Sequence, residues 1–174
     1  VCAYNGGTLE NLTVAGSIEA KDFAAGIFAA SLPMKEEDET LSKLVNHAKV
    51  TADGTAAGIV AQTKEKVLLE DCVNTGVIEA AVAAGITTAE CENLVLMRCQ
   101  NYAPIISSDN ESYGITSNLT ANLTDCVGVS ENVYPIAADA NESENCLYFI
   151  SGGEKLEDAL LADICDISLT IGET

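Results

Sequence analysis

The sequence predicts an all-β fold, a right-handed parallel β-helix (solenoid) of about five to six irregular coils. The phrase Ala-Gly-Ile at 25–27 recurs at 57–59 and 84–86, and weaker copies lie at 113–116 and 134–137. The copies are 21 to 32 residues apart. A unit of this length is one supersecondary element that cannot bury its own apolar face, so successive copies must stack.

A second set of equivalent positions lies out of phase with the first. Each copy begins with an aliphatic residue or a cysteine and often has asparagine two positions later. The residues that begin the five copies are Leu12, Leu44, Cys72, Cys99 and Cys126. The phrases between turn residues are short and rich in Val, Ile and Thr, which favours strands over helical repeats. The Leu-x-x-Leu-x-Leu frame of leucine-rich repeats is missing.

Stacking turns these sets into ladders with a spacing of about 4.8 Å. We expect Asn46, Asn74 and Asn101 to lie above one another at a corner, bonded to each other and to turn backbone. Cysteines at 72, 99 and 126 should form an inward ladder in which a free thiol behaves as a small apolar group. The same spacing falls within the Cα range of a disulfide, although mostly free thiols are the favoured interpretation.

The segments Gly7–Leu9 and Glu10–Ile18, with the Cys-x-Asn-x-Gly frame, resemble the GLUG-type repeats of bacterial cell-surface proteins. The resemblance covers roughly residues 1–140. It implies a surface β-solenoid at an extracellular or cell-surface location, and it implies almost nothing about activity. The chain departs from the family where Gly-Gly-Ile is expected, because the first glycine is replaced by Ala25, Ala57, Ala84 or Tyr113.

Two regions are expected. Residues 1–150 form the β-helix, which starts inside a repeat phrase and therefore looks like part of a longer polypeptide. Polar stretches at 31–40, 62–66 and 107–112 are predicted to be projecting loops. Residues 151–174 are predicted to form a cap, a short helix and then a strand, because Ser151 and Glu154 match a capping box.

Charge excludes several partners. The net charge is −19 and only eight residues are basic, which argues against binding nucleic acid or an anionic membrane surface. No apolar run reaches the length of a membrane span, so membrane insertion is not expected. Glycan or protein ligands and other domains of the parent polypeptide remain as partners.

Residues that suggest catalysis are scarce. His47 is the only histidine and is expected at an exposed corner. Glu19 and Glu79 occupy equivalent positions, but Thr51 and Ile106 lie in the coils beside them. Glycoside cleavage needs two converging carboxylates. No catalytic residue is therefore predicted, and a carbohydrate-active β-helix enzyme, a glycosidase or lyase, is the alternative.

Binding residues are suggested by aromatic side chains. Tyr102, Tyr113 and Tyr134 could offer stacking surfaces for a sugar, although Tyr113 and Tyr134 are equivalent and could equally form a packed ladder. The predicted function is a non-catalytic module of a bacterial surface or secreted protein, serving as adhesin, spacer, or carbohydrate- or protein-binding surface.

A calcium site is a weaker option, and no cofactor is otherwise predicted. Oxygen donors gather in two acidic segments, neither of which matches an EF-hand or a calcium-binding nonapeptide repeat, so solvated loops are the favoured interpretation. The candidate ligands are Glu36, Glu37, Asp38, Asp109 and Glu111.

Overall fold

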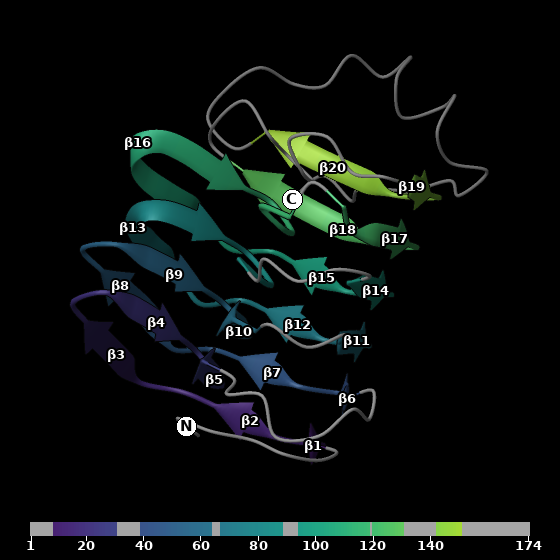
Figure 1. The fold of residues 1–174 in the computed structure, drawn as a ribbon, viewed down its shortest axis with the longest axis horizontal. Helices are drawn as coiled ribbons and strands as arrows, with labels where there is room; N and C mark the ends of the chain where they lie inside the picture. Colours follow the sequence, from purple (N-terminus) through teal and green to yellow (C-terminus); the bar gives the residue numbers. More distant parts are fainter. Residues whose placement is uncertain are drawn as a thin grey trace, which may run out of the picture.

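The computed structural model describes residues 9–30, 39–63, 67–88, 94–118, 120–130 and 142–150. These ranges contain strands and turns and no helix, and hence no helix able to cross a membrane. Strand pairs are parallel throughout, and consecutive turns of the chain stack as a β-solenoid (Figure 1). The predicted parallel β-helix is confirmed.

Two walls of the solenoid each contain six parallel strands. The first wall stacks β1 (Leu9–Glu10), β6 (Glu39–Ser42), β11 (Val67–Glu70), β14 (Val95–Met97), β17 (Asn122–Thr124) and β19 (Glu142–Glu144). The second stacks β2 (Thr13–Val14), β7 (Val45–Asn46), β12 (Val73–Asn74), β15 (Gln100–Asn101), β18 (Val127–Ser130) and β20 (Leu147–Ile150).

The third wall contains longer strands and turns a corner. It stacks β3 (Ser17–Ala20), β8 (Lys49–Ala52), β13 (Ile78–Ala84) and β16 (Ile105–Tyr113), and β13 also pairs with β9 (Thr55–Ala57), which pairs with β4 (Phe23–Ala25). A fourth strip pairs β5 (Phe28–Ala30) with β10 (Val60–Gln62) and continues through bridges from Val60 to Thr87 and from Thr87 to Thr116.

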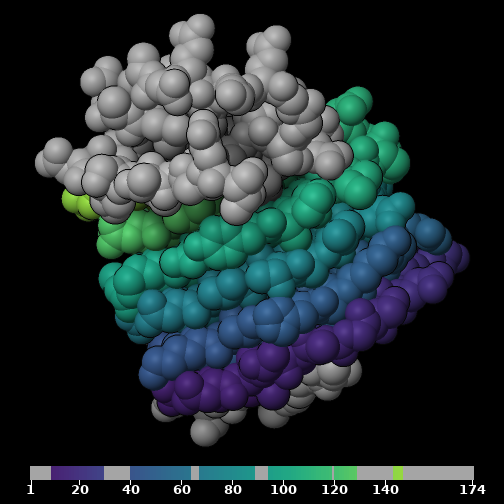
Figure 2. Space-filling model, turned by 180° about the vertical axis from the view of Figure 1, so that it is seen from behind, coloured from purple at the N-terminus to yellow at the C-terminus, as the bar shows by residue number. Residues whose placement is uncertain are grey.

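Four coils are therefore complete in the described residues, at 9–30, 39–63, 67–88 and 94–118. We number them coils 1 to 4. The segments 120–130 and 142–150 extend the first two walls only, so the described residues form about four full coils, slightly fewer than the five to six expected. Figure 2 shows bands of colour that follow one another from purple to green, so neighbouring coils in sequence are neighbours in space. The predicted cap at 151–174 lies outside the described residues.

The register confirms the sequence alignment of the repeats. Val45 pairs with Val73, Val73 with Gln100 and Gln100 with Val127, which places the Leu44 position beside Cys72, Cys99 and Cys126. In the third wall, one column runs Ala25, Ala57, Ala84, Tyr113. Buried aliphatic side chains of the first wall, of the fourth strip and of the turn before it fill the interior, among them Ile27, Ile59, Ile86, Ile115, Leu41, Leu69 and Leu96.

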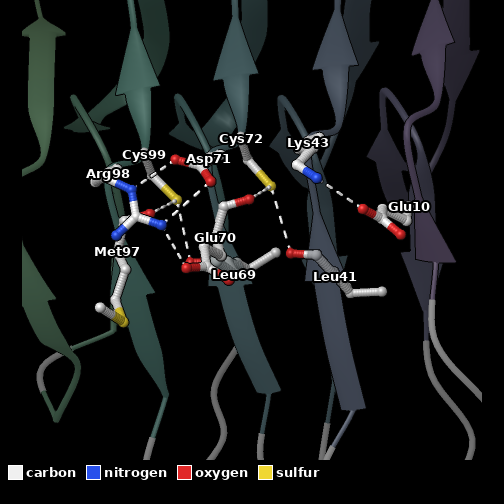
Figure 3. A network of polar contacts seen from close by, with 10 residues as sticks. All are labelled: Glu10, Leu41, Lys43, Leu69, Glu70, Asp71, Cys72, Met97, Arg98 and Cys99. Atoms are coloured by element: carbon white, nitrogen blue, oxygen red, sulfur yellow. Dashed lines mark hydrogen bonds and ion pairs between the residues drawn. The ribbon is translucent and has the colours of Figure 1, made fainter.

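One residue per coil turns the corner between the first and second walls in the left-handed backbone region. These residues have φ between 52° and 58°, and they are Asn11, Lys43, Asp71, Arg98, Asp125 and Asn145. Asn and Asp tolerate this region, whereas Lys and Arg pay a conformational cost. Both basic residues are held by acidic groups of the preceding coil (Figure 3), Lys43 by Glu10 at 2.8 Å and Arg98 by Asp71 at 2.7 Å.

The predicted asparagine ladder is confirmed. Asn46 Nδ2 donates to Asn74 Oδ1 at 2.8 Å, and Asn74 Nδ2 donates to Asn101 Oδ1 at 2.7 Å. Each Nδ2 also donates to the carbonyl two residues further on, and each Oδ1 accepts the N–H of that residue. All three side chains are fully buried. Internal bonding of this kind offsets the cost of burying the amides.

The glycines of the repeat phrase pack against this ladder. A Cβ on Gly58 would lie 2.0 Å from the Gly85 carbonyl oxygen and 2.6 Å from Asn74 Cγ. Gly26 faces Asn46, and Gly85 faces Asn101, at similar distances. The Ala-Gly-Ile and Cys-x-Asn columns therefore meet across the interior, and the asparagine side chain fills the space that a glycine leaves.

Candidate ligand-binding groove

A hollow of about 370 Å³ lies on the outer surface where the third wall meets the strip of β5 and β10. One side is the column Phe23, Thr55, Val82, Glu111, which contributes one residue from each of the four coils. We call this hollow the groove, and its lining residues are Phe23, Thr55, Ala61, Gln62, Val82, Thr88, Glu111, Tyr113 and Ser117. Because coils are about 4.8 Å apart, the groove follows the stacking axis for roughly 14 Å.

Small side chains lie beside the inner angle of the groove, where Ala61 is the one that lines it. Ala25, Ala57 and Ala61 form a buried cluster of their own, separate from the interior of the solenoid. Tyr113 takes the place of alanine in the same column in coil 4, where it is 8% exposed and lines the groove. A bulky ring therefore replaces a methyl group at the coil 4 end. Tyr134, the predicted neighbour of Tyr113, lies outside the described residues.

The predicted tyrosines do not converge. Tyr102 is 54% exposed, its hydroxyl donates to Gln100 Oε1 at 2.6 Å, and it does not line the groove. The exposed aromatic in the groove is instead Phe23, at 42% exposure in coil 1. The sequence prediction of binding residues considered tyrosines and did not include Phe23. The sequence feature that could have identified Phe23 as a surface residue is its position in a column whose other members, Thr55, Val82 and Glu111, include polar side chains.

Polar side chains facing the groove are available to a ligand. The side chains of Thr55, Gln62 and Glu111 have no hydrogen-bonding partner among the residues that the structure describes. They supply a hydroxyl, a carboxamide and a carboxylate, and hence both donors and acceptors. Thr88 is partly committed, since its hydroxyl donates to the Ala61 carbonyl at 2.6 Å.

A bulge in β16 places Glu111 in the groove. Ala80 pairs with Ser107 and Val82 pairs with Glu111, so β16 carries two extra residues at this point. Ser107 holds the bulge, because its hydroxyl accepts the N–H of Glu111 at 2.9 Å and the N–H of Asp109 at 3.2 Å. The prediction of a projecting loop at 107–112 is therefore corrected. These residues are a bulged part of a strand.

The bulge does not gather metal ligands. Asp109 is exposed and accepts a hydrogen bond from Ser108 at 3.0 Å, while Glu111 lines the groove. Within the described ranges, no cluster of three or more His, Cys, Asp or Glu side chains is arranged to hold a metal ion. The other calcium candidates, Glu36, Glu37 and Asp38, lie outside the described residues.

The equivalent carboxylates of the third wall lie away from the groove. Glu19 and Glu79 both pair with Thr51, so they are two coils apart, and Glu79 forms an ion pair with Lys49 at 2.7 Å. Among the described lining residues, Glu111 is the one carboxylate. His47 is exposed, and its ring nitrogen hydrogen-bonds the Thr75 hydroxyl of the next coil, as expected for a corner residue.

No protein-family model matches this chain, and neither a curated protein nor a solved structure does.

Proposed function

We propose that the chain is a non-catalytic module of a bacterial surface or secreted protein, and that its groove binds an uncharged glycan. The observation that carries the proposal is the groove itself. It crosses four coils of a hydrogen-bonded stack and combines aromatic surface with polar groups that have no partner within the described structure.

The lining suits a sugar chain because sugars present apolar C–H faces together with hydroxyl groups. Phe23 and Tyr113 offer apolar surface at the two ends of the groove, in coils 1 and 4. Thr55 and Gln62 lie between them, and their side-chain donors and acceptors have no partner among the described residues. A few polar groups set in a largely preformed, partly apolar site are typical of small-ligand binding. An elongated ligand lying along the stacking axis fits this arrangement.

Charge decides which glycans are favoured. The chain has a net charge of −19, and Glu111 adds a carboxylate to the groove itself. An acidic polysaccharide would be repelled at long range and would meet no basic side chain among the described lining residues. The single arginine, Arg98, lies at a corner and is bound to Asp71 and Glu70. An uncharged glycan is free of this repulsion.

The groove favours binding over cleavage. Glycosidases use two carboxyl groups roughly 5 to 10 Å apart. In the described lining, Glu111 has no second carboxylate beside it. The resemblance of residues 10–18 to GLUG-type repeats supports the surface or secreted location and a role as adhesin or spacer. The enzyme alternative is retained as an outcome of the test.

Binding to an array of uncharged oligosaccharides, followed by calorimetry on the best ligand, tests the proposal. Phe23→Ala should weaken binding about tenfold, since stacking on an aromatic is worth about 1 kcal/mol or more. Tyr102→Ala is the matched control, an exposed aromatic outside the groove, and should bind as the wild type does. Equal loss in both variants, or no binding across the array, would contradict the proposal. Turnover of the glycan that disappears in Glu111→Gln would establish the enzyme instead.

A further inference from the structure

The cysteine ladder is longer than the sequence indicated. Val127 pairs with Leu147, which places Cys146 beside Cys126 and extends the ladder to four cysteines, each directly before a strand of the second wall. The sequence analysis left Cys146 out because the last coil is shortened and its asparagine position holds Tyr148. We define the cysteine ladder as Cys72, Cys99, Cys126 and Cys146, all of which are free thiols in the structure.

Neighbouring thiols of the ladder lie in stacked coils. The pairings of Val73 with Gln100, Gln100 with Val127 and Val127 with Leu147 set each cysteine beside the next one in the ladder. Adjacent strands place the Cα atoms about 4.8 Å apart, inside the range of roughly 4.4 to 6.8 Å that a disulfide accepts. Each thiol also lies over backbone carbonyls, as when Cys99 contacts the Leu69 carbonyl oxygen at 3.4 Å and Cys126 contacts that of Thr124 at 3.4 Å.

The four thiols of the ladder differ in solvent exposure. Cys72, Cys99 and Cys126 are fully buried, whereas Cys146 at the last coil is only half-buried. Burial raises the pKa of the Cys99 thiol well above its usual value, which slows its reaction. The neighbouring Cys126 thiol and burial also raise the pKa of Cys146, so solvent exposure, and not a lowered pKa, is what favours reaction at Cys146. An oxidant from solution therefore meets Cys146 first.

We propose that the cysteine ladder is a redox modification site. A low-molecular-weight disulfide oxidises Cys126 and Cys146, and the disulfide bond that forms between these two residues cross-links two consecutive coils. The Cys146 thiolate attacks the external disulfide, forms a mixed disulfide and releases one thiol. The Cys126 thiolate then attacks the Cys146 sulfur, which forms the internal bond and releases the second thiol. Both protein protons end on the two released thiols, so two protein thiols are oxidised and one external disulfide is reduced.

The register also fixes the pairing at complete oxidation. If Cys126 pairs with Cys146, then Cys72 and Cys99 remain as adjacent partners. If Cys99 paired with Cys126, the remaining two thiols would be three coils apart, about 14 Å, and beyond the reach of a disulfide. Full oxidation therefore gives two cross-links, 72–99 and 126–146.

Oxidised glutathione applied to the folded protein tests this site. A Cys2→Ser, Cys91→Ser, Cys165→Ser background leaves only the ladder cysteines. After alkylation of unreacted thiols, cleavage at glutamate separates all four positions, since glutamates lie between each pair. We expect the 126–146 cross-link first and 72–99 later, together with a shift of the urea midpoint to higher concentration.

A Cys146→Ala variant provides the control, because a half-buried site tolerates this change. It should lose the 126–146 cross-link and react more slowly overall, while its circular dichroism matches that of the background protein. Four thiols that stay free while a denatured sample reacts fully would overturn the proposal. A first cross-link between Cys99 and Cys126, or links only between molecules, would overturn it as well.

Discussion

Replacing Asn74 by alanine tests the asparagine ladder most sharply. The Asn74 side chain makes four hydrogen bonds, with Asn46 at 2.8 Å, with Asn101 at 2.7 Å, and with the carbonyl and N–H of Gly76 at 2.9 and 3.3 Å. A net contribution of about 0.5 to 1.5 kcal/mol per bond gives a loss of about 4 kcal/mol. Breaking a buried network places the substitution among the strongly destabilising changes.

Urea unfolding followed by circular dichroism measures this loss as a change in the free energy of unfolding. The matched control is Asn110→Gly, which removes an exposed asparagine from the β16 bulge and keeps the positive φ of 62° accessible. The control should change the free energy of unfolding by less than about 0.5 kcal/mol. If Asn74→Ala costs less than about 1 kcal/mol, the ladder contributes little and the reasoning is wrong.

Three further predictions follow from the packing and the charges. Gly58→Ala places a Cβ 2.0 Å from the Gly85 carbonyl oxygen and should lower the free energy of unfolding by about 3 kcal/mol or more, measured in urea; a loss below about 1 kcal/mol would show that the coils separate easily. Arg98 lowers the pKa of Asp71 through its hydrogen bond, so this pairing stabilises the fold above the usual carboxyl pKa of 3.8 and is lost as pH falls through the lower folded value. Arg98→Gln should therefore lower the melting temperature slightly at pH 7 and not at pH 2, and an equal effect at both values would exclude the ion pair as the cause. Addition of calcium or of a chelator should leave the melting temperature unchanged. A rise in the melting temperature with calcium would instead indicate that the acidic segments bind this ion.

The repeat columns were predictable because stacking converts sequence period into spatial register. The alignment of Leu44 with Cys72 and of Ala25 with Ala57 needed no three-dimensional information. Buried asparagines at a fixed position implied a ladder, since an isolated buried amide would be costly. Contact between the glycine and asparagine columns was not predictable, because sequence spacing does not tell which walls face each other across the interior.

The groove was not predictable from the sequence, because that too requires knowing which parts of the repeat lie next to each other. Its lining comes from two walls that meet at an angle set by the corner after β4 and β9, so Phe23 and Gln62 belong to different parts of the repeat. The bulge that brings Glu111 into the groove depends on Ser107 bonding to two backbone N–H groups. The polar stretch at 107–112 therefore had the composition of a loop although it forms part of a strand.

Backbone amide chemical shifts during titration with the best uncharged oligosaccharide test the central claim most directly. The account predicts that the largest changes fall on groove residues from all four coils, including Phe23, Gln62, Thr88 and Glu111, and leave the corner around Arg98 unaffected. Changes centred on Tyr102 or on the strands β3 and β8, with no change at the groove residues, would contradict it.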